Sequence, residues 1–283
     1  MLVTPGELLS KAYQGNYSIG AFDAAEYLSF EAIIDAAEAK KTPVIVMVAN
    51  IWFPLIDVEK LAAAMLERIH RSPLPIALLL DHGTNYDDCL KSIRYGFSGI
   101  MFDGSALDPE ENIAKTKELA DIAHAAGLSI EGEIGHVAGN EGEGTFTPNE
   151  ADASLYTNPQ DALDFVQKTG VDALAVAFGN VHGVYKGSPV LQFDLLDEIK
   201  KTVNVPLVMH GGSGLVREDY IQSVKHGINK VNFFTAVSKV GTEAVIEKYN
   251  QTSGNVHYFE LAEAGKKEMQ KMVEGYIDMM GGK

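Results

Sequence analysis

Short apolar runs recur along the chain, and amphipathic stretches separate them. Runs of this length, rich in β-branched residues and bounded by turn residues, predict buried strands. The candidate strands are residues 17–22, 43–48, 75–81, 99–103, 128–135, 172–178, 206–210 and 230–234. Between them, apolar residues repeat with helical spacing over residues 27–39, 58–71, 109–126, 159–169 and 194–203. Alternation of this kind predicts parallel strands joined by crossover helices.

Eight strands favour a closed (β/α)₈ TIM barrel, formed as a single domain by residues 1–283. Barrels of this type run to about 250 residues as one unit, so the length fits. An open doubly wound sheet is the alternative, but no GxGxxG follows the first strand to support it. The polar, glycine-rich segment 135–158 fits neither helix nor strand. A long loop in a compact barrel is typical of a mobile active-site lid, which we predict here, with a solvated insertion as the alternative.

Composition narrows the classes of partner and compartment. Hydrophobic residues make up 46% of the chain, and its formal net charge is −16. Such an acidic protein repels nucleic acid and anionic bilayers, so we expect neither as a partner. The N-terminus has no signal-peptide core, and no apolar run approaches the length of a membrane helix, which together favour a cytoplasmic protein. The single cysteine, Cys89, is expected to be a buried structural thiol.

Three histidines follow predicted strands at their carboxyl ends, where barrel enzymes place their chemistry. They are His82 after PIALLLD, His182 after DALAVAF, and His210 at the end of PLVMH. Three imidazoles from one rim match a catalytic zinc site, which leaves a fourth position open. Four other histidines fall in or beside the helical segments and are expected on the surface or in packing: His70, His124, His226 and His257.

Asp81 ends an otherwise apolar strand beside His82, where a carboxylate without a role would be costly. It is interpreted as a general acid or base next to a bound carbonyl. The alternative is a group that only orients a ligand histidine.

A phosphate site is predicted where strands seven and eight end. Gly211, Gly212, Ser213 and Gly214 precede a helical pattern, and their backbone N–H groups can face an anion. The next strand ends with the segment Asn232 to Thr235, which adds an amide and a hydroxyl at the same corner. Barrels repeatedly bind phosphate with the loops after these two strands. For the glycines alone, a tight turn is the alternative.

Over nearly its whole length, the sequence resembles the class II, zinc-dependent ketose-bisphosphate aldolases, which include fructose- and tagatose-bisphosphate aldolases. The most specific pieces are LLLDHG (78–83), SIEGEIG (129–135), TGVDALAVAFGNVHGVYKG (169–187), MHGGSG (209–214) and KVNFFT (230–235). The resemblance implies reversible cleavage of a ketose 1-phosphate or 1,6-bisphosphate to dihydroxyacetone phosphate and an aldehyde, through a zinc-stabilised enediolate. It also implies a homodimer or homotetramer and leaves open a monovalent cation.

The resemblance assigns roles to individual positions. Asp81 matches the proton donor to the aldehyde oxygen, and Glu141 matches the base that deprotonates the triose phosphate. Zn²⁺ would be held by His82, His182 and His210, and Glu133 matches a glutamate that lies near the metal and ligates it in some states. The positions that match contacts to dihydroxyacetone phosphate are Gly183, Gly211, Gly212, Ser213, Asn232, Phe233, Phe234 and Thr235.

Other residues depart from the family pattern or have no role in it. Ala49 stands where a hydroxyl residue often contacts a phosphate, Asn140 replaces a frequent acid, and no counterpart is found for an arginine that grips the second phosphate. The sequence therefore leaves open whether the distal end of the sugar carries a phosphate, another anion or neither. Lys230 is placed at the amino end of its strand and Lys186 in a loop, so neither is expected to form a Schiff base. The alternatives are an aldolase of the same mechanism on a different phosphorylated ketose, another metal-dependent barrel such as an isomerase, and a non-catalytic sugar-phosphate-binding barrel.

Overall fold

A computed structural model describes residues 1–137, 139, 145–146, 153–185 and 190–281. Within these residues, parallel strands close a barrel in the order β1-β10-β9-β7-β5-β4-β3-β2. The barrel strands are β1 (Ile19–Asp23), β2 (Val44–Ala49), β3 (Ile76–Gly83), β4 (Gly99–Phe102), β5 (Ser129–Ile134), β7 (Ala173–Val176), β9 (Leu207–Met209) and β10 (Ile228–Phe233). All eight predicted strands are confirmed with small shifts of their ends, and the open sheet is wrong.

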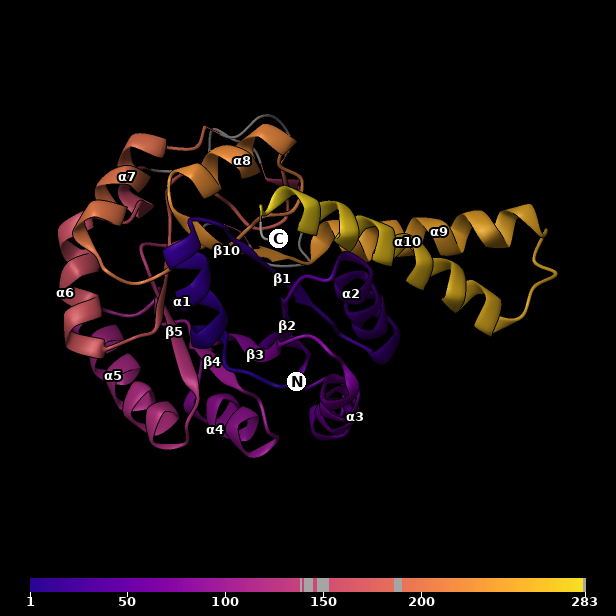
Figure 1. Ribbon diagram of the computed structural model, residues 1–283, viewed down its shortest axis with the longest axis horizontal. Coiled ribbons are helices and arrows are strands. Elements are labelled where there is room, and N and C mark those ends of the chain that lie inside the picture. The colour runs from indigo at the N-terminus through magenta and orange to yellow at the C-terminus, as the bar shows by residue number, and fades with distance from the viewer. Residues whose placement is uncertain (138, 140–144, 147–152, 186–189, 282–283) are drawn as a thin grey trace.

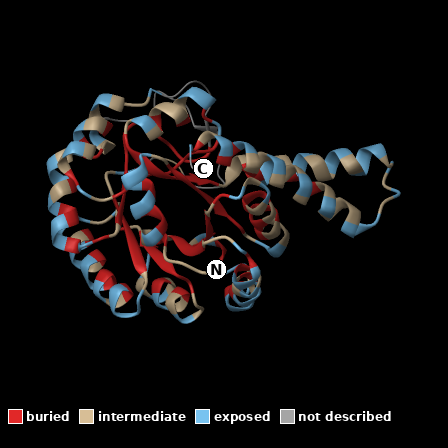
Figure 2. Cartoon of the chain, in the orientation of Figure 1, coloured by how far each residue is buried: buried red, intermediate tan, exposed pale blue. Residues whose placement is uncertain are grey.

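Helices surround this barrel, with their exposed faces turned outward and the buried strands inside (Figures 1 and 2). They are α1 (Pro5–Gly15), α2 (Tyr27–Lys40), α3 (Val58–Arg71), α4 (Tyr86–Arg94), α5 (Pro109–Ala125), α6 (Pro159–Thr169), α7 (Phe193–Thr202), α8 (Arg217–Lys225), α9 (Thr235–Gln251) and α10 (Tyr258–Met279). Local sequence sets where they begin. Thr4 and Glu7 form a capping box at α1, for example, and Asn158 caps α6 ahead of Pro159.

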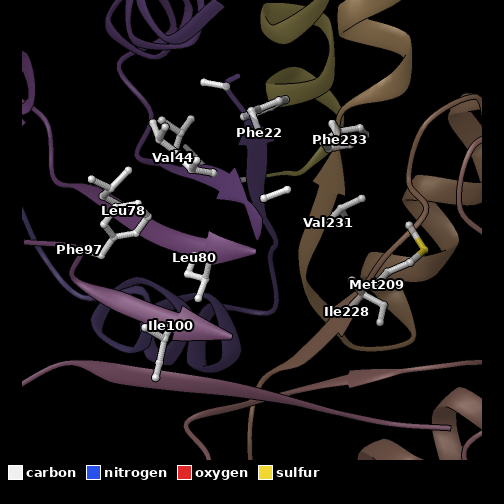
Figure 3. Close-up of a cluster of buried hydrophobic side chains, with 14 of the residues drawn as sticks. Phe22, Val44, Leu78, Leu80, Phe97, Ile100, Met209, Ile228, Val231 and Phe233 are labelled. Carbon is white, nitrogen blue, oxygen red and sulfur yellow. The ribbon is translucent and has the colours of Figure 1, made fainter. Parts of the chain in front are cut away.

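The strands read as continuous apolar runs because both of their faces are buried. The outward faces pack against the helices in one large core, which Figure 3 shows around Phe22, Leu80, Val231 and Phe233. The inward faces form a second, smaller core with Leu8, Leu9 and Ala12 of α1. Helix α1 therefore closes the amino end of the barrel and leaves the carboxyl end for a site (Figure 1).

Two features extend beyond the barrel and its ring of helices. β6 (Thr145–Phe146) and β8 (Val184–Tyr185) form a small parallel sheet. Helices α9 and α10 pair along their length and project from the barrel as an arm (Figure 1). Aromatic side chains such as Tyr258 and Phe259 lie exposed on α10. Among the described residues, no helix has both the length and the apolar character needed to cross a bilayer.

Half of the predicted active-site loop 135–158 lies outside the described residues, so its role as a lid stays a prediction. Its described part includes a 3₁₀ turn at Ala153–Leu155. Thr157 joins the end of this segment to the barrel, because its hydroxyl donates to the Ile134 carbonyl and accepts from the Ala177 N–H. Both ends of the segment therefore lie at the carboxyl rim.

Candidate metal centre and active site

Three imidazoles converge at the carboxyl rim of the barrel. His82 lies on β3, His182 follows β7, and His210 follows β9 directly. Their ring centroids are 5.0 Å (82–182), 4.6 Å (82–210) and 5.8 Å (182–210) apart. One nitrogen from each ring can be chosen so that all three lie within 4.8 Å of one another. The sequence prediction that these histidines meet is confirmed.

The partners of the rings fix which nitrogen faces the centre. Nδ1 of His82 is 2.8 Å from Asp103 Oδ2, and Nδ1 of His182 is 3.3 Å from the Val137 carbonyl oxygen. Nε2 of His210 is 3.0 Å from Glu131 Oε1. Because carboxylate and carbonyl oxygens only accept, each of these nitrogens must donate. Nε2 of His82, Nε2 of His182 and Nδ1 of His210 are then the nitrogens left to bind a metal.

Burial and charge act differently on the rings. Burial, followed by the charges of His82 and His210, lowers the pKa of His182 well below its ordinary value. Burial and His82 also lower the pKa of His210, but hydrogen bonding to Glu131 and Glu133 outweighs them and raises it to about 9. Nδ1 of His210 lies 3.3 Å from Glu133 Oε2.

A divalent metal fits this pocket. Nε2 of His182 is buried and has no hydrogen-bond partner among the described residues. Three imidazoles whose other nitrogens are held by oxygens are the donor set of an open zinc site. Glu133 Oε2 lies 3.3 Å from His210 Nδ1, and its role as a metal ligand stays a prediction. A second set of possible ligand atoms, from His82, Asp103 and Glu133, also lies within 4.8 Å of one another and shares His82 with the first set.

Asp81 lies beside the metal-binding nitrogens and is completely buried. Its Oδ1 accepts a hydrogen bond of 3.0 Å from Asn232 Nδ2. Its Oδ2 has no hydrogen-bond partner among the described residues and lies 4.0 Å from His82 Nε2. One carboxylate oxygen is therefore held in place while the other faces the centre.

The backbone at the rim is tightly constrained. His82 adopts a φ of +47°, which is uncommon for a residue with a side chain. Gly211 has a φ of +67°, and a Cβ built there would lie 2.0 Å from the Val181 carbonyl oxygen. Asn180 also donates through Nδ2 to the His210 carbonyl at 3.1 Å. The segments that present His182 and His210 are thus in direct contact.

The residues of the predicted phosphate corner lie together at the carboxyl rim, and their groups differ in what they can offer. The Gly212 N–H donates to the Asn232 carbonyl at 3.1 Å, so it ties the two loops together and is already used. The Ser213 hydroxyl accepts from the N–H groups of Phe234 (3.4 Å) and Ala236 (3.3 Å) at the start of α9. The residue that precedes this helix, Phe234, provides no side-chain cap, and Ser213 contacts these N–H groups from the neighbouring loop instead. The corner therefore contains a helix N-terminus and a hydroxyl.

The remaining predicted contacts can be placed as well. The ring of Phe233 stacks on Phe22 and Tyr276 in the outer core, so only the backbone of this residue faces the site. Phe234 packs against Trp52, and Thr235 is the first residue of α9. Gly183 is buried beside His182, with a φ of +91°. Glu141 lies outside the described residues.

A cavity of about 420 Å³ opens above the histidines. Its lining includes Ala49, Asn50, Thr84 and Glu133. His136 also lines it and contacts Ser105, with 3.3 Å between Nδ1 and Oγ. Neither lysine nor arginine is among the described residues that line this cavity. The described walls thus offer amide, hydroxyl, imidazole and carboxylate groups.

Sequence reasoning missed three charged residues that act on the histidines. Asp103 follows the apolar run GIMF at the carboxyl end of β4, the same signal that identified Asp81. Burial raises the pKa of Asp103, but hydrogen bonds from His82 and Ser105 outweigh it and hold that pKa well below its ordinary value. Glu131 and Lys230 form a buried ion pair of 2.7 Å beneath His210. Burial raises the pKa of Glu131, but Lys230 and His210 outweigh it and lower the value to about 2.

The fold and the site together define a class of protein. The carboxyl rim of this TIM barrel carries three convergent imidazoles, a buried carboxylate beside them and a helix N-terminus. This combination is typical of enzymes that use a metal ion to act on an anionic carbonyl compound.

Comparison with known proteins narrows the class. Residues 3–283 match the family model described as fructose-bisphosphate aldolase class-II, so the chain belongs to that family. It is 36% identical over 274 residues to a sulfofructosephosphate aldolase from Alkalicoccus urumqiensis, covering 97% of this chain and 94% of that protein. The crystal structure of the YdjI aldolase from Escherichia coli K12 superimposes with a TM-score of 0.87 at 29% identity, covering 99% of this chain and 98% of that one. The protein is thus a class II ketose-phosphate aldolase, a lyase with a candidate metal site at His82, His182 and His210.

Proposed function

We propose that the protein is a zinc-dependent aldolase that reversibly cleaves a ketose 1-phosphate, or a 1,6-bisphosphate of the fructose or tagatose type, to dihydroxyacetone phosphate and an aldehyde. One observation carries the proposal: the three imidazole nitrogens that face the centre, the N-terminus of α9, and Asp81 Oδ2, which has no hydrogen-bond partner among the described residues, lie at one rim. A bound zinc ion would supply a Lewis acid for the ketone carbonyl and acidify the adjacent C–H.

In this proposal, the phosphate of the substrate binds at the start of α9. Helix N-termini bind anions through N–H groups that the helix itself leaves unused, and at α9 two of the first N–H groups contact the Ser213 hydroxyl. Ser213 adds a hydroxyl, and the backbone of Gly183 allows close approach because this residue has no side chain. His210 and Gly211 are adjacent in sequence, so phosphate and carbonyl of the same molecule are placed side by side.

Asp81 is the proposed proton donor to the aldehyde oxygen, and the proton acceptor in the cleavage direction. Asn232 holds its Oδ1, which leaves Oδ2 to exchange the proton with the substrate oxygen. Glu141 is proposed as the base that removes the proton from dihydroxyacetone phosphate, on the basis of the family motif alone. Proton exchange on dihydroxyacetone phosphate alone tests this role, and unchanged exchange in Glu141→Ala would refute it.

The distal substituent of the sugar is the least constrained part of the proposal. The relative from Alkalicoccus urumqiensis is named for a sulfonated sugar phosphate. The described cavity wall offers Asn50, Thr84 and His136 and lacks lysine and arginine, which suits a hydroxyl or a single negative charge better than a second phosphate. A cleavage panel of ketose 1-phosphates with a hydroxyl, carboxylate, sulfonate or phosphate at the distal end would identify it. The readout is the triose phosphate released.

Metal removal tests the mechanism itself. A strong chelator should abolish cleavage, and zinc should restore it in proportion to the metal bound; full activity in metal-free protein would refute the proposal. The homodimer or homotetramer that the family resemblance implies is part of the same proposal and can be measured by sedimentation. A non-catalytic sugar-phosphate-binding barrel would bind dihydroxyacetone phosphate without cleaving any ketose in the panel.

A further inference from the structure

Lys230 is a buried charge that the proposed chemistry does not use. Its side chain is 0% exposed, at the third position of β10. Its neighbours in register, Ile19 and Val208, both belong to the apolar core inside the barrel. An ammonium group loses its hydration there, so the fold must compensate for it.

The carboxylate of Glu131 compensates the buried charge of Lys230 and also contacts His210. Nζ of Lys230 lies 2.7 Å from Glu131 Oε2, while the other oxygen, Oε1, lies 3.0 Å from His210 Nε2. All three side chains are at most 3% exposed. These contacts form a buried chain of side chains from the inner core to one of the three convergent imidazoles.

The order of charges in this chain determines how His210 is oriented. An ionised carboxylate can only accept, so Nε2 of His210 must be the nitrogen that carries the proton. Nδ1 is then the nitrogen directed to the centre, beside Glu133. Lys230 holds one oxygen of Glu131, which keeps the other on the imidazole.

We propose that the buried pair Lys230–Glu131 is a positioning device that holds His210 in the tautomer and orientation in which Nδ1 binds the metal. The inference rests on the proposed metal site and assigns no contact with substrate to either residue. Outer partners of this kind are worth about 10- to 100-fold in metal affinity in other proteins.

The test uses metal-free full-length protein and Co²⁺ as the probe. Lys230→Met removes the cation, and the double variant Lys230→Met/Glu131→Gln removes both charges at nearly constant volume. Lys266→Met is the matched control, because Lys266 also forms a lysine–carboxylate pair, 2.8 Å from Asp35, on the outside of the barrel. Co²⁺ affinity is measured by competition with a chelator, and the Co²⁺ absorption spectrum reports the coordination geometry.

We expect Lys230→Met to bind Co²⁺ about 10- to 100-fold more weakly than the wild type, with an altered spectrum. The double variant should regain the thermal stability of the metal-free wild type but stay about tenfold weaker for Co²⁺, because a neutral amide can offer either an oxygen or an NH₂ group to His210. Lys266→Met should match the wild type in both affinity and spectrum.

Two results would overturn the inference while leaving the proposed function intact. One is a double variant that binds Co²⁺ with wild-type affinity and spectrum, since the pair would then serve only the fold. The other is a ¹⁵N NMR spectrum of zinc-loaded wild type that places the proton of His210 on Nδ1; this measurement needs no variant to fold. If the wild type binds neither Co²⁺ nor Zn²⁺, the metal site and the proposed function fail together.

Discussion

Replacing Gly211 by alanine should disable the metal centre through a backbone clash, without touching any metal-binding atom. Gly211 has a φ of +67°, and its added Cβ would lie 2.0 Å from the Val181 carbonyl oxygen and 3.1 Å from the His182 nitrogen. Ordinary contact begins near 3.4 Å, so the two segments must separate by more than about 1 Å. Both segments present a histidine to the same centre.

The loss of stability expected in Gly211→Ala has two parts that can be measured separately. A left-handed φ costs a residue with a Cβ about 1–2 kcal/mol wherever it occurs. Gly127 has a φ of +75° with nothing within 4 Å of an added Cβ, so Gly127→Ala measures that part alone. Any further loss of stability in Gly211→Ala is then due to the clash with Val181. Tetrahedral zinc tolerates displacements of only about 0.2 Å, so a shift of this size at His182 should cost about 100-fold or more in metal affinity.

Urea unfolding of both metal-free variants gives the stability, and chelator competition gives the affinity for zinc. Gly127→Ala should lose stability and retain metal, whereas Gly211→Ala should lose both. Wild-type zinc affinity in Gly211→Ala would refute the reasoning, because His182 and His210 would then not depend on the contact between their loops.

Three further predictions concern other parts of the molecule. Asp81→Asn should retain stoichiometric zinc while losing at least about 100-fold in ketose cleavage, since general acid–base steps contribute about that much; loss of zinc as well would instead make Asp81 an orienting group. Burial raises the pKa of the Cys89 thiol to about 12, so it should resist alkylation at pH 8 in native protein and react in urea, and rapid native labelling would contradict this. Arg68→Met should destabilise the fold by about 1–2 kcal/mol at pH 7, because Arg68 pairs with Glu38 at 2.9 Å in a half-buried position. The hydrogen bond from Arg68 lowers the pKa of Glu38, so this stabilisation is present above its ordinary value of 4.5 and is lost as the pH falls; a difference between variant and wild type that did not narrow in acid would argue against the pairing.

The strands and the three histidines could be predicted because their signals are local. Barrel strands buried on both faces give unbroken apolar runs, and a polar residue that ends such a run belongs to the catalytic rim. His82 and His210 both satisfy that rule. Cys89 followed from its helical surroundings, and it is buried on α4.

Partnerships between distant strands could not be read in the same way. Lys230 and Glu131 are 99 residues apart, and Asn232 and Asp81 are 151 apart, so each pair depends on the register of the closed barrel. The alternation of inward and outward side chains along a strand would have predicted that Lys230 faces the inside of the barrel. Lys230 lies two residues before Asn232, which was expected to face the site, and so it shares the same inward face of β10.

Helix α1 closes the amino end of the barrel, so the site opens only at the carboxyl rim. Its apolar side chains and the inward faces of the strands fill the barrel beneath the buried charges, so metal and substrate can reach the histidines only from the carboxyl rim. In the direction of carbon–carbon bond formation, the reactant that occupies the deeper position must bind first, and in the cleavage direction the same molecule must leave last. The order of binding, a kinetic property, would then follow from an eleven-residue helix that touches none of the reactants.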